Sequence, residues 1–294
     1  MNTTIAACVV LYNPPDDVLL NIKSYYEQVN YLIAIDNSEK ENTIFEHECR
    51  QLFPGIIYKW QGSNTGIAGA LNTACQLSIE KGYNWLLTMD QDSCFAKGDL
   101  QKMIDHIHLA QKKFANIGII TPLHIVSNEE TDMTNEAFKK LNIVMTSGNL
   151  LNLAVYRQAG HFNESLFIDF VDYEYCIRLQ QSGFTIIQDN AIRMKHSLGD
   201  FFVRHLLGFK FGVSNHNHIR RYYKTRNSLF VGFKYRKTQQ KFFLLSLFYT
   251  LIYDPLIIVL YEENKIKKLK AIFYGIKDFL QKKYGQQNSL ITSL

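Results

Sequence analysis

The chain has 294 residues, of which 47% are hydrophobic and 20% charged, so it can bury a full core and is not an intrinsically disordered protein. Its formal net charge of +5 hides an asymmetry, because residues 201–253 hold ten of the 32 basic residues and none of the 27 acidic ones. Such a block predicts an anionic partner: phosphate, nucleic acid or an acidic membrane surface.

The cysteines and the N-terminal residues indicate a compartment. The five cysteines form no CxxC pair and share no paired spacing, which disfavours a zinc site or a disulfide framework. A reduced, cytoplasmic protein is therefore expected. The apolar run at residues 5–11 has no basic segment before it and is too short for a signal peptide, so we expect it to be the first strand.

Apolar runs and helical stretches alternate over the first third of the chain. The runs predicted to be strands are residues 5–11, 31–35, 56–60 and 85–89. Helices are expected between them, and the one over residues 67–81 opens with small residues that let a backbone or a ligand approach closely. This alternation predicts an α/β fold with a mostly parallel sheet and crossover helices.

The fourth run ends in Asp90, Gln91 and Asp92. Open parallel sheets bind ligands at the carboxyl ends of their strands, and in an extended chain Asp90 and Asp92 point the same way, with Gln91 opposite. Two carboxylates on one side repel each other unless a cation lies between them, and such oxygen ligands favour Mg²⁺ or Mn²⁺. The triplet therefore predicts a metal–nucleotide site, with a turn of solvated aspartates as the alternative.

The middle of the chain continues the pattern less regularly. A helix is expected at residues 97–115, a strand at 117–122, and a flexible loop over the site at 128–142. Gly148 lies between strand-like flanks, so it either lets the chain pass close to a bound ligand or is an ordinary turn glycine.

A second acidic stretch, residues 167–179, combines carboxylates with aromatic and aliphatic side chains. Asp172 falls near the start of a predicted helix, where it is either a helix cap or a functional carboxylate. A last strand at residues 185–187 leads towards His196, which is either a metal ligand or a surface histidine.

Several of these motifs occur together in one known family: Asp36-Asn37-Ser38, Asn64-x-Gly66, Asp90-Gln91-Asp92-Ser93, Ser147-Gly148, Asp172-Tyr173-Glu174 with Arg178, and His196. In this order and spacing they resemble family 2 inverting glycosyltransferases with the GT-A fold. Residues 167–172, 196–200, 222–227 and 275–279 resemble more closely the bacterial rhamnosyltransferases that assemble cell-surface polysaccharides such as O-antigen or capsule. The likeness spans nearly the whole chain.

The resemblance implies a donor site along the carboxyl ends of the strands. The residues it assigns to the nucleotide and its sugar are Leu11, Tyr12, Asn13, Asp36, Asn64, Gly66, Asp90, Gln91 and Gly148. It assigns Asp92 and His196 to an Mg²⁺ or Mn²⁺ ion. Arg226 is expected to clamp a phosphate, since its guanidinium pairs bidentately with phosphate, or else to be structural.

Asp172 corresponds to the catalytic base of the family. Many members carry a Glu-Asp pair there, whereas this chain has Val171-Asp172, so the first acid is absent, as in the rhamnosyltransferase-like subgroup. Asp169 and Glu174 are the competing carboxylates, as a secondary acid or an acceptor contact. Inverting transfer needs one base to deprotonate the acceptor hydroxyl while that hydroxyl attacks the anomeric carbon.

The C-terminal third predicts contact with a membrane. Residues 242–261 are apolar over about the length of a membrane span, but Asp254 and Pro255 interrupt them. We expect two helices that lie on the membrane surface, and a basic amphipathic helix over residues 265–280. The alternatives are a helix that spans the membrane, or helices that complete the core or form a homodimer interface.

These expectations combine into one hypothesis. A GT-A catalytic domain spans residues 1–200, and a basic helical extension for the acceptor or the membrane spans residues 201–294. The protein transfers a sugar, L-rhamnose from dTDP-rhamnose, to a lipid-linked saccharide at the cytoplasmic face of the cell membrane, and nucleic acid is not its partner. The alternatives are transfer of galactofuranose, glucose or galactose from a UDP donor, or a nucleic-acid or anion-binding module.

Overall fold

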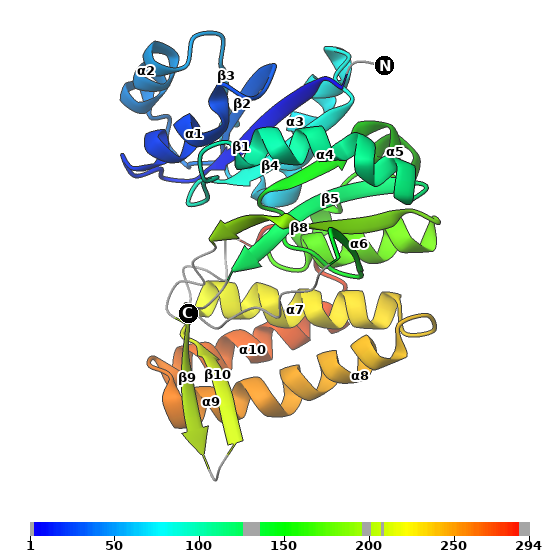
Figure 1. Ribbon diagram of the computed structural model, residues 1–294. Coiled ribbons are helices and arrows are strands. Elements are labelled where there is room, and N and C mark those ends of the chain that lie inside the picture. The colour runs from blue at the N-terminus through cyan, green and yellow to red at the C-terminus, as the bar shows by residue number, and fades with distance from the viewer. Residues whose placement is uncertain (1–2, 126–135, 196–200, 207–208, 288–294) are drawn as a thin grey trace. The chain divides into compact units, whose positions relative to one another are not determined.

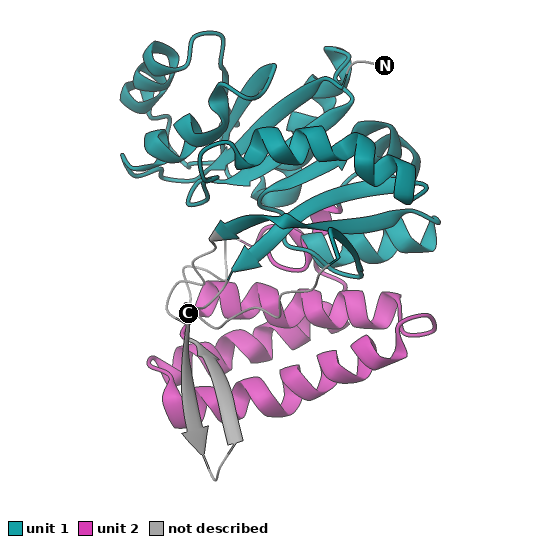
Figure 2. Ribbon diagram, viewed as in Figure 1, with its two compact units in different colours: residues 1–162, 172–197 teal, residues 163–171, 198–294 magenta. Residues whose placement is uncertain are grey.

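A computed structural model describes residues 3–125, 136–195, 201–206 and 209–287 (Figure 1). The chain divides into two compact units (Figure 2). Unit 1 consists of Met1–Phe162 and Asp172–Ser197, and unit 2 of Asn163–Val171 and Leu198–Leu294. The short segment Asn163–Val171 thus belongs to the second unit although the first surrounds it in sequence. The division predicted at residue 200 instead makes each domain one continuous stretch of the chain.

Unit 1 is built on a mixed sheet whose described strands have the order β3-β2-β1-β4-β7-β5-β8-β6. Their bounds are β1 Ile5–Leu11, β2 Tyr31–Asp36, β3 Ile57–Trp60, β4 Trp85–Asp90, β5 Ile117–Ile125, β6 Phe138–Leu141, β7 Asn149–Asn152 and β8 Thr185–Lys195. Strands β1 to β4 pair in parallel, as do β5 and β8, whereas β7 is antiparallel to β4 and β5, and β6 is antiparallel to β8. The predicted α/β fold with a mostly parallel sheet is confirmed.

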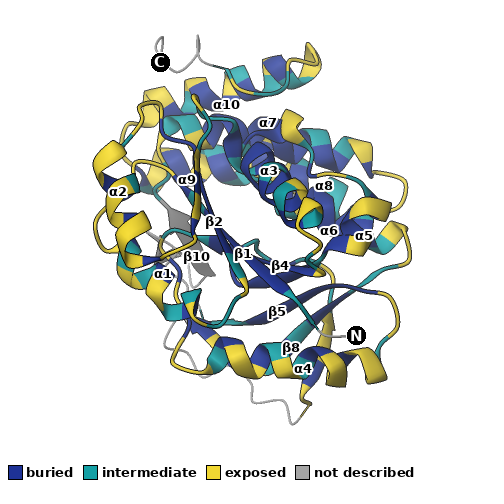
Figure 3. Cartoon of the chain, turned by 90° about the horizontal axis from the view of Figure 1, so that it is seen from above, coloured by how far each residue is buried: buried dark blue, intermediate teal, exposed yellow. Residues whose placement is uncertain are grey.

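The helices of unit 1 cover both faces of this sheet. Their bounds are α1 Val18–Tyr26, α2 Thr43–Leu52, α3 Gly66–Glu80, α4 Asp99–Lys113, α5 Leu153–Ala159 and α6 Val171–Gln181, whose first residue belongs to unit 2. Ala7, Val9 and Leu11 of β1 join one buried cluster with side chains of α1, α2 and α4. Figure 3 shows α4 on one side of the strands and α3 on the other. Strands covered on both faces are continuously apolar, which is why they stood out in the sequence.

The strand register brings the predicted donor-site positions to one edge of the sheet. Leu11 pairs with Asp36 and Asp36 with Trp60, and Val10 pairs with Asp90. The carboxyl ends of β1, β2, β3 and β4 are therefore level, and the loops that follow them share that edge.

Part of the segment expected to be a flexible loop is a strand. Residues 138–141 form β6 on the edge of the sheet, and Phe138 is buried against Phe114 and His106. Lys139 and Lys140 face outward, as is common on edge strands. A strand of four residues offers too little periodicity to be recognised, and the remaining loop residues 128–135 lie outside the described ranges.

Unit 2 is mainly helical. Its elements are the 3-10 turn η1 Glu164–Leu166, the antiparallel strands β9 Phe201–Leu206 and β10 Phe209–Ser214, and the helices α7 His218–Lys234, α8 Gln240–Phe248, η2 Tyr249–Tyr253 (a π-helical turn), α9 Asp254–Tyr261 and α10 Lys265–Leu280. Gly275 of α10 lies against α7, since a Cβ there would stand 2.9 Å from the Tyr222 carbonyl oxygen. The Tyr222 hydroxyl donates to the Asp278 carboxylate at 2.7 Å across the same contact.

A buried ion network joins α7, α9 and α10. Arg221 pairs with Asp254 at 3.1 Å and with Glu262 at 2.6 Å, and Lys268 pairs with Glu262 at 2.9 Å. Because buried charges are costly unless paired, this network explains why acidic residues interrupt the apolar C-terminal stretch. Asp254 anchors that stretch to α7 within unit 2.

Candidate active site

The loop after β2 is organised by a buried carboxylate. One Asp36 oxygen accepts hydrogen bonds from the Ser38 amide at 2.9 Å and the Ser38 hydroxyl at 2.6 Å, and the other accepts from the Tyr58 hydroxyl at 2.6 Å. Asp36 is fully buried, and burial, together with this hydrogen bond, raises the pKa of Tyr58. The carboxylate therefore shapes the loop, and its direct contact with a nucleotide base stays a prediction.

The next residue, Asn37, fastens this loop to the start of α3. Its amide donates to the Gly66 carbonyl at 2.9 Å and accepts from the Thr65 hydroxyl at 2.9 Å. Asn64 in turn accepts from the Gly66 amide at 2.9 Å, and Gly66 adopts a φ of 74°. Asn64 and Gly66 are thus placed next to the end of β2, and their contact with a donor stays a prediction.

Gln91 connects the tips of β1 and β4. The Tyr12 amide donates to its Oε1 at 2.8 Å, and its Nε2 donates to the Tyr12 carbonyl at 3.3 Å. The Asn13 amide donates to the Ser38 hydroxyl at 2.8 Å, which joins the loop after β1 to the loop after β2. Gln91 therefore joins the ends of β1 and β4, and its role in donor binding stays a prediction.

The two aspartates of the triplet differ in exposure. Asp90 is half-buried, and its amide donates to the Ser147 hydroxyl at 3.0 Å. Asp92 is exposed, and no hydrogen bond or ion pair to its carboxylate is found in the described ranges. Such a carboxylate suits a hard divalent cation. The described residues contain no group of three metal-binding side chains, and His196 lies outside them.

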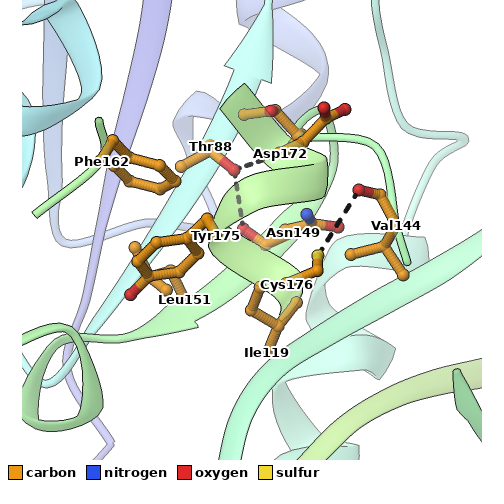
Figure 4. A pocket seen from close by; sticks show the side chains of 10 residues that line it. Thr88, Ile119, Val144, Asn149, Leu151, Phe162, Asp172, Tyr175 and Cys176 are labelled. Atoms are coloured by element: carbon orange, nitrogen blue, oxygen red, sulfur yellow. Dashed lines mark hydrogen bonds between the residues drawn. The ribbon is translucent and has the colours of Figure 1, made fainter. Parts of the chain in front are cut away.

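Asp172 stands at a small cavity of unit 1, beside the end of β4 (Figure 4). The polar lining residues are Thr88, Thr146, Asn149 and Asp172, and Thr88 is two residues from Asp90. The cavity measures about 10 Å³, which is room for roughly one water molecule and not for a sugar ring. Asp172 Oδ1 also accepts a hydrogen bond at 2.8 Å from the backbone amide of Tyr173, in the first turn of α6.

Burial sets the chemistry of the other groups around this cavity. Burial, with a smaller contribution from the Asp172 carboxylate, raises the pKa of the Cys176 thiol to about 12. The thiol is therefore protonated at neutral pH and is not a competing nucleophile. Asn149 Oδ1 is buried without a hydrogen-bond partner in the described part of the chain, and its amide donates to the Met145 carbonyl at 2.5 Å.

Glu174 was expected to be an alternative acid, and the structure contradicts that role. Its carboxylate is buried and pairs with Arg178 at 3.0 Å. Arg178 also donates to the carbonyls of Ala159, Gly160 and His161. The Glu174–Arg178 pair thus fastens α6 to the chain after α5, and the carboxylate is not open to an acceptor.

The predicted phosphate clamp at Arg226 is also wrong. Arg226 is fully buried in unit 2, and its guanidinium donates to three backbone carbonyls and to the Asn227 side chain. The N–H groups of the guanidinium are therefore already bonded to groups of the protein. Asp169, the other competing carboxylate, pairs with Arg220 at 3.2 Å within the same unit, and burial raises its pKa.

Gly148 is required by packing inside the protein. A Cβ at this position would stand 2.7 Å from Met194 Cε and 3.0 Å from Pro122 Cγ, and the residue has a φ of 80°. This conformation suits a turn glycine, and a close approach of the chain to a ligand at Gly148 stays a prediction. Its amide donates to the Thr88 carbonyl at 2.7 Å, which places Thr146 and Ser147 beside the end of β4.

Four polar residues of the structure were not assigned a site role from the sequence: Asn37, Ser38, Asn149 and Asn227. Asn37 and Ser38 carried a usable signal, because polar side chains directly after a buried strand end at the ligand edge. Asn227 lay in the motif at residues 222–227, but its backbone partners are nearly sixty residues away and could not be read from the sequence, and Asn149 carried no signal of its own.

Comparison with known proteins agrees with this geometry. Residues 6–143 match Glycosyl transferase family 2. The dTDP-rhamnosyl transferase RfbF of Shigella flexneri is 27% identical over 290 residues, which cover 92% of this chain and 93% of that protein.

Solved structures share the fold. S. aureus TarS 1-349 in complex with UDP-GlcNAc matches with a TM-score of 0.61 at 12% identity, over 96% of this chain and 82% of that chain. GalNAc-T7 with UDP, GalNAc and Mn²⁺ matches with a TM-score of 0.54 at 13% identity, over 70% of this chain and 44% of that chain. At these identities the likeness concerns the fold alone, which is the predicted GT-A fold.

Proposed function

We propose that the chain is a family 2 glycosyltransferase that transfers L-rhamnose from dTDP-rhamnose, with inversion, to a lipid-linked saccharide in cell-surface polysaccharide assembly. The choice of donor follows the relative that aligns over nearly its whole length, a dTDP-rhamnosyl transferase. A UDP-sugar donor is the alternative, because a protein of the same fold was solved with UDP-GlcNAc.

One observation carries the assignment of the base. Asp172 lines a cavity of unit 1 beside the end of β4, and of the two competing acids Glu174 is buried in a pair with Arg178 and Asp169 pairs with Arg220 in unit 2. We infer that Asp172 accepts the proton of the acceptor hydroxyl as that oxygen bonds to the anomeric carbon. The bond from that carbon to the nucleoside diphosphate breaks in the same step, and the diphosphate leaves with the electron pair.

The donor site in this proposal lies along the level ends of β1, β2 and β4. Leu11, Tyr12 and Asn13 line it from β1, and Asn64 and Gly66 from the start of α3. Asp92, with Asp90 beside it, would hold Mg²⁺ or Mn²⁺, and the metal would offset the negative charge of the leaving diphosphate. His196 stays a candidate ligand from the sequence alone.

The test of this function combines turnover with donor binding. Asp172→Asn is expected to lower transfer by at least about 10³-fold, because the amide cannot accept the proton, while dTDP-rhamnose binds with nearly unchanged affinity. Transfer is measured with a panel of dTDP- and UDP-sugars, and binding by calorimetry. Full turnover of Asp172→Asn would reject the base assignment, and activity with UDP-sugars alone would reject the donor.

Membrane association is a further part of the proposal, and the pattern of exposure in unit 2 supports it. Residues Gln240–Tyr261 form a helical stretch long and apolar enough to cross a membrane, with a mean hydropathy of 2.0, and only 28% of its most apolar window is buried. Its polar residues Ser246, Thr250 and Asp254 face inward at helical spacing, each at most 5% exposed. Its exposed side chains are Leu244, Leu245, Phe248, Tyr249, Leu251, Ile252, Leu256, Val259 and Leu260.

On a surface helix of a soluble protein the apolar side chains usually face the interior and the polar ones face water. Here the polar side chains face the interior and the apolar ones are exposed. Ser246 faces inward because α8 approaches α7 closely at Gly232, and Asp254 because it pairs with Arg221. Exposed basic residues flank the apolar stripe, at Arg236, Lys237 and Lys241 before it and at Lys265 and Lys267 after it. We propose that this stripe lies in the surface of an anionic membrane, with a homodimer interface as the alternative.

A further inference from the structure

The segment directly before Asp172 has an unusual backbone. Phe167, Asp169 and Phe170 adopt φ values of 64°, 59° and 66°, in the left-handed region that side chains other than glycine rarely enter. Three such residues within four positions are unfavourable, and they persist only where surrounding contacts hold them. Asn163–Val171 belongs to unit 2, so the holding contacts must be sought there.

Asn227 of α7 supplies most of these contacts. Its Nδ2 donates to the carbonyls of Leu166 at 2.7 Å, Ile168 at 2.7 Å and Asp169 at 3.0 Å. One amide group thereby gathers three carbonyls of a segment that forms no regular ladder of its own. Because buried carbonyls need partners, the side chain of Asn227 replaces secondary structure here.

Arg226 binds the same segment. Its guanidinium donates to the carbonyls of Ser165 at 3.2 Å and Leu166 at 3.3 Å, and to Gly285 at 2.7 Å. Its Nε donates to Asn227 Oδ1 at 3.0 Å, which orients the Asn227 amide towards the segment. Both side chains are fully buried, and the guanidinium lies over the ring of Tyr223 at 5.0 Å.

Two further residues of α7 hold the segment on the same helix. The Phe167 ring packs on Tyr223 at 5.0 Å between centroids, and Asp169 pairs with Arg220 at 3.2 Å. Arg220, Tyr223 and Asn227 follow one another at positions i, i+3 and i+7, so they lie on one face of α7. The segment is thus fixed at most of its residues between 165 and 169.

From these contacts we propose that Arg226 and Asn227 are positioning residues, which set the place of Asp172 through the segment Asn163–Val171. This rests on the proposed role of Asp172 as the base. Asp172 follows Val171 directly and stands three residues after Asp169, whose carbonyl Asn227 holds. A base must lie within hydrogen-bond reach of the acceptor hydroxyl, so a displacement of about 1 Å can lower the rate about 100-fold.

The test uses Asn227→Ala, which removes all three hydrogen bonds to the segment. We expect kcat to fall about 10- to 100-fold while the Kd for the nucleotide-sugar donor changes less than about 2-fold. Amide exchange in residues 167–172 is expected to accelerate. Glu262→Gln is the matched control, because Glu262 is equally buried in unit 2 and paired with Arg221 and Lys268, yet makes no contact with the segment in the described structure. Its kcat per folded molecule should stay at the wild-type value.

A second variant covers the case in which Asn227→Ala does not fold. Arg220→Ala removes the contact to Asp169 from a side chain that is 50% exposed, so folding should be preserved. It is expected to lower kcat about 3- to 10-fold at unchanged donor affinity. Wild-type kcat in whichever of the two variants folds would overturn the proposal, as would an equal loss of kcat in Glu262→Gln. Full turnover of Asp172→Asn would instead show that the proposed base is wrong.

Discussion

The carboxylates of the site differ in how many partners the protein provides. Asp36 is buried and accepts three hydrogen bonds, and Glu174 forms an ion pair with Arg178. Both carboxylates therefore interact with groups of the protein itself. Asp92 is exposed at the end of β4. Because no partner of the Asp92 carboxylate is found among the described residues, it keeps its capacity for a cation, which supports Asp92 and not Asp36 as the expected metal ligand.

This difference leads to a prediction for Asp92→Ala. We expect Mn²⁺ to strengthen dTDP binding at least about tenfold in the wild type and to have little effect in the variant, because the metal loses its carboxylate ligand. Calorimetric titration of dTDP with and without Mn²⁺ measures this. Asp105→Ala, an exposed aspartate on α4, is the control and should behave as the wild type. An equal metal effect in wild type and Asp92→Ala would contradict the assignment.

Arg226 shows how a residue type can mislead. An arginine in a basic block suggests phosphate, yet this guanidinium binds backbone carbonyls in the interior. The same five donors serve either purpose, and only the surroundings decide between them. Apart from the motif at residues 222–227, no pattern in the basic block distinguishes Arg226 from exposed basic residues such as Arg220 and Arg236.

At the scale of the elements, the helices α8 and α9 have their apolar side towards solvent. Leu251 and Ile252 are more than half exposed, whereas Thr250 beside them is 2% exposed. Apolar side chains that face water at helical spacing over this length are typical of an interaction surface.

We therefore predict that Phe248→Glu combined with Leu251→Glu lowers binding to vesicles that contain anionic lipid at least about tenfold. The reason is that two exposed apolar side chains, which would enter the membrane surface, become charged. Co-sedimentation with the vesicles measures the loss. Leu20→Glu combined with Ile44→Glu is the matched control, because these side chains are 72% and 75% exposed in unit 1 and should leave binding unchanged. If the stripe variant instead changes a dimer into a monomer by light scattering, the surface is a homodimer interface.

At the scale of the whole molecule, the basic block concentrates positive charge in unit 2, and part of that charge is internal. His216 lies among Arg220, Arg221, Lys224 and Lys268, and burial, followed by these cations, lowers its pKa to about 4. Between about pH 4 and pH 6.5, His216 is thus mostly neutral in the folded protein, whereas in the unfolded chain, with an ordinary pKa near 6.5, it binds a proton.

The sign of the pH effect follows from this lowered pKa. Between about pH 6.5 and pH 4 the unfolded state binds more protons at His216, so the free energy of unfolding is expected to decrease as the pH falls through this range. In His216→Asn the decrease in Tm should be smaller by about 2–4 °C. Thermal unfolding at several pH values measures this, with exposed His47→Asn as the control. Identical acid profiles for His216→Asn and the wild type would reject the effect.

The sequence alone determined the class of fold, and it predicted the edge of the sheet at which the proposed donor site lies. Continuous apolar strands that end in polar residues are a local signal, and parallel strands place their carboxyl ends together regardless of the details of packing. Asp36, Asp90 and Asn64 were predicted in this way, and the structure places them at the carboxyl ends of β2 and β4 and before α3. Only the tertiary structure decided which charged groups are committed inside, because burial and pairing depend on residues far apart in the chain. It showed that Glu174 and Arg226 are bound inside the protein, and that the segment before Asp172 is held by a helix that begins nearly fifty residues later.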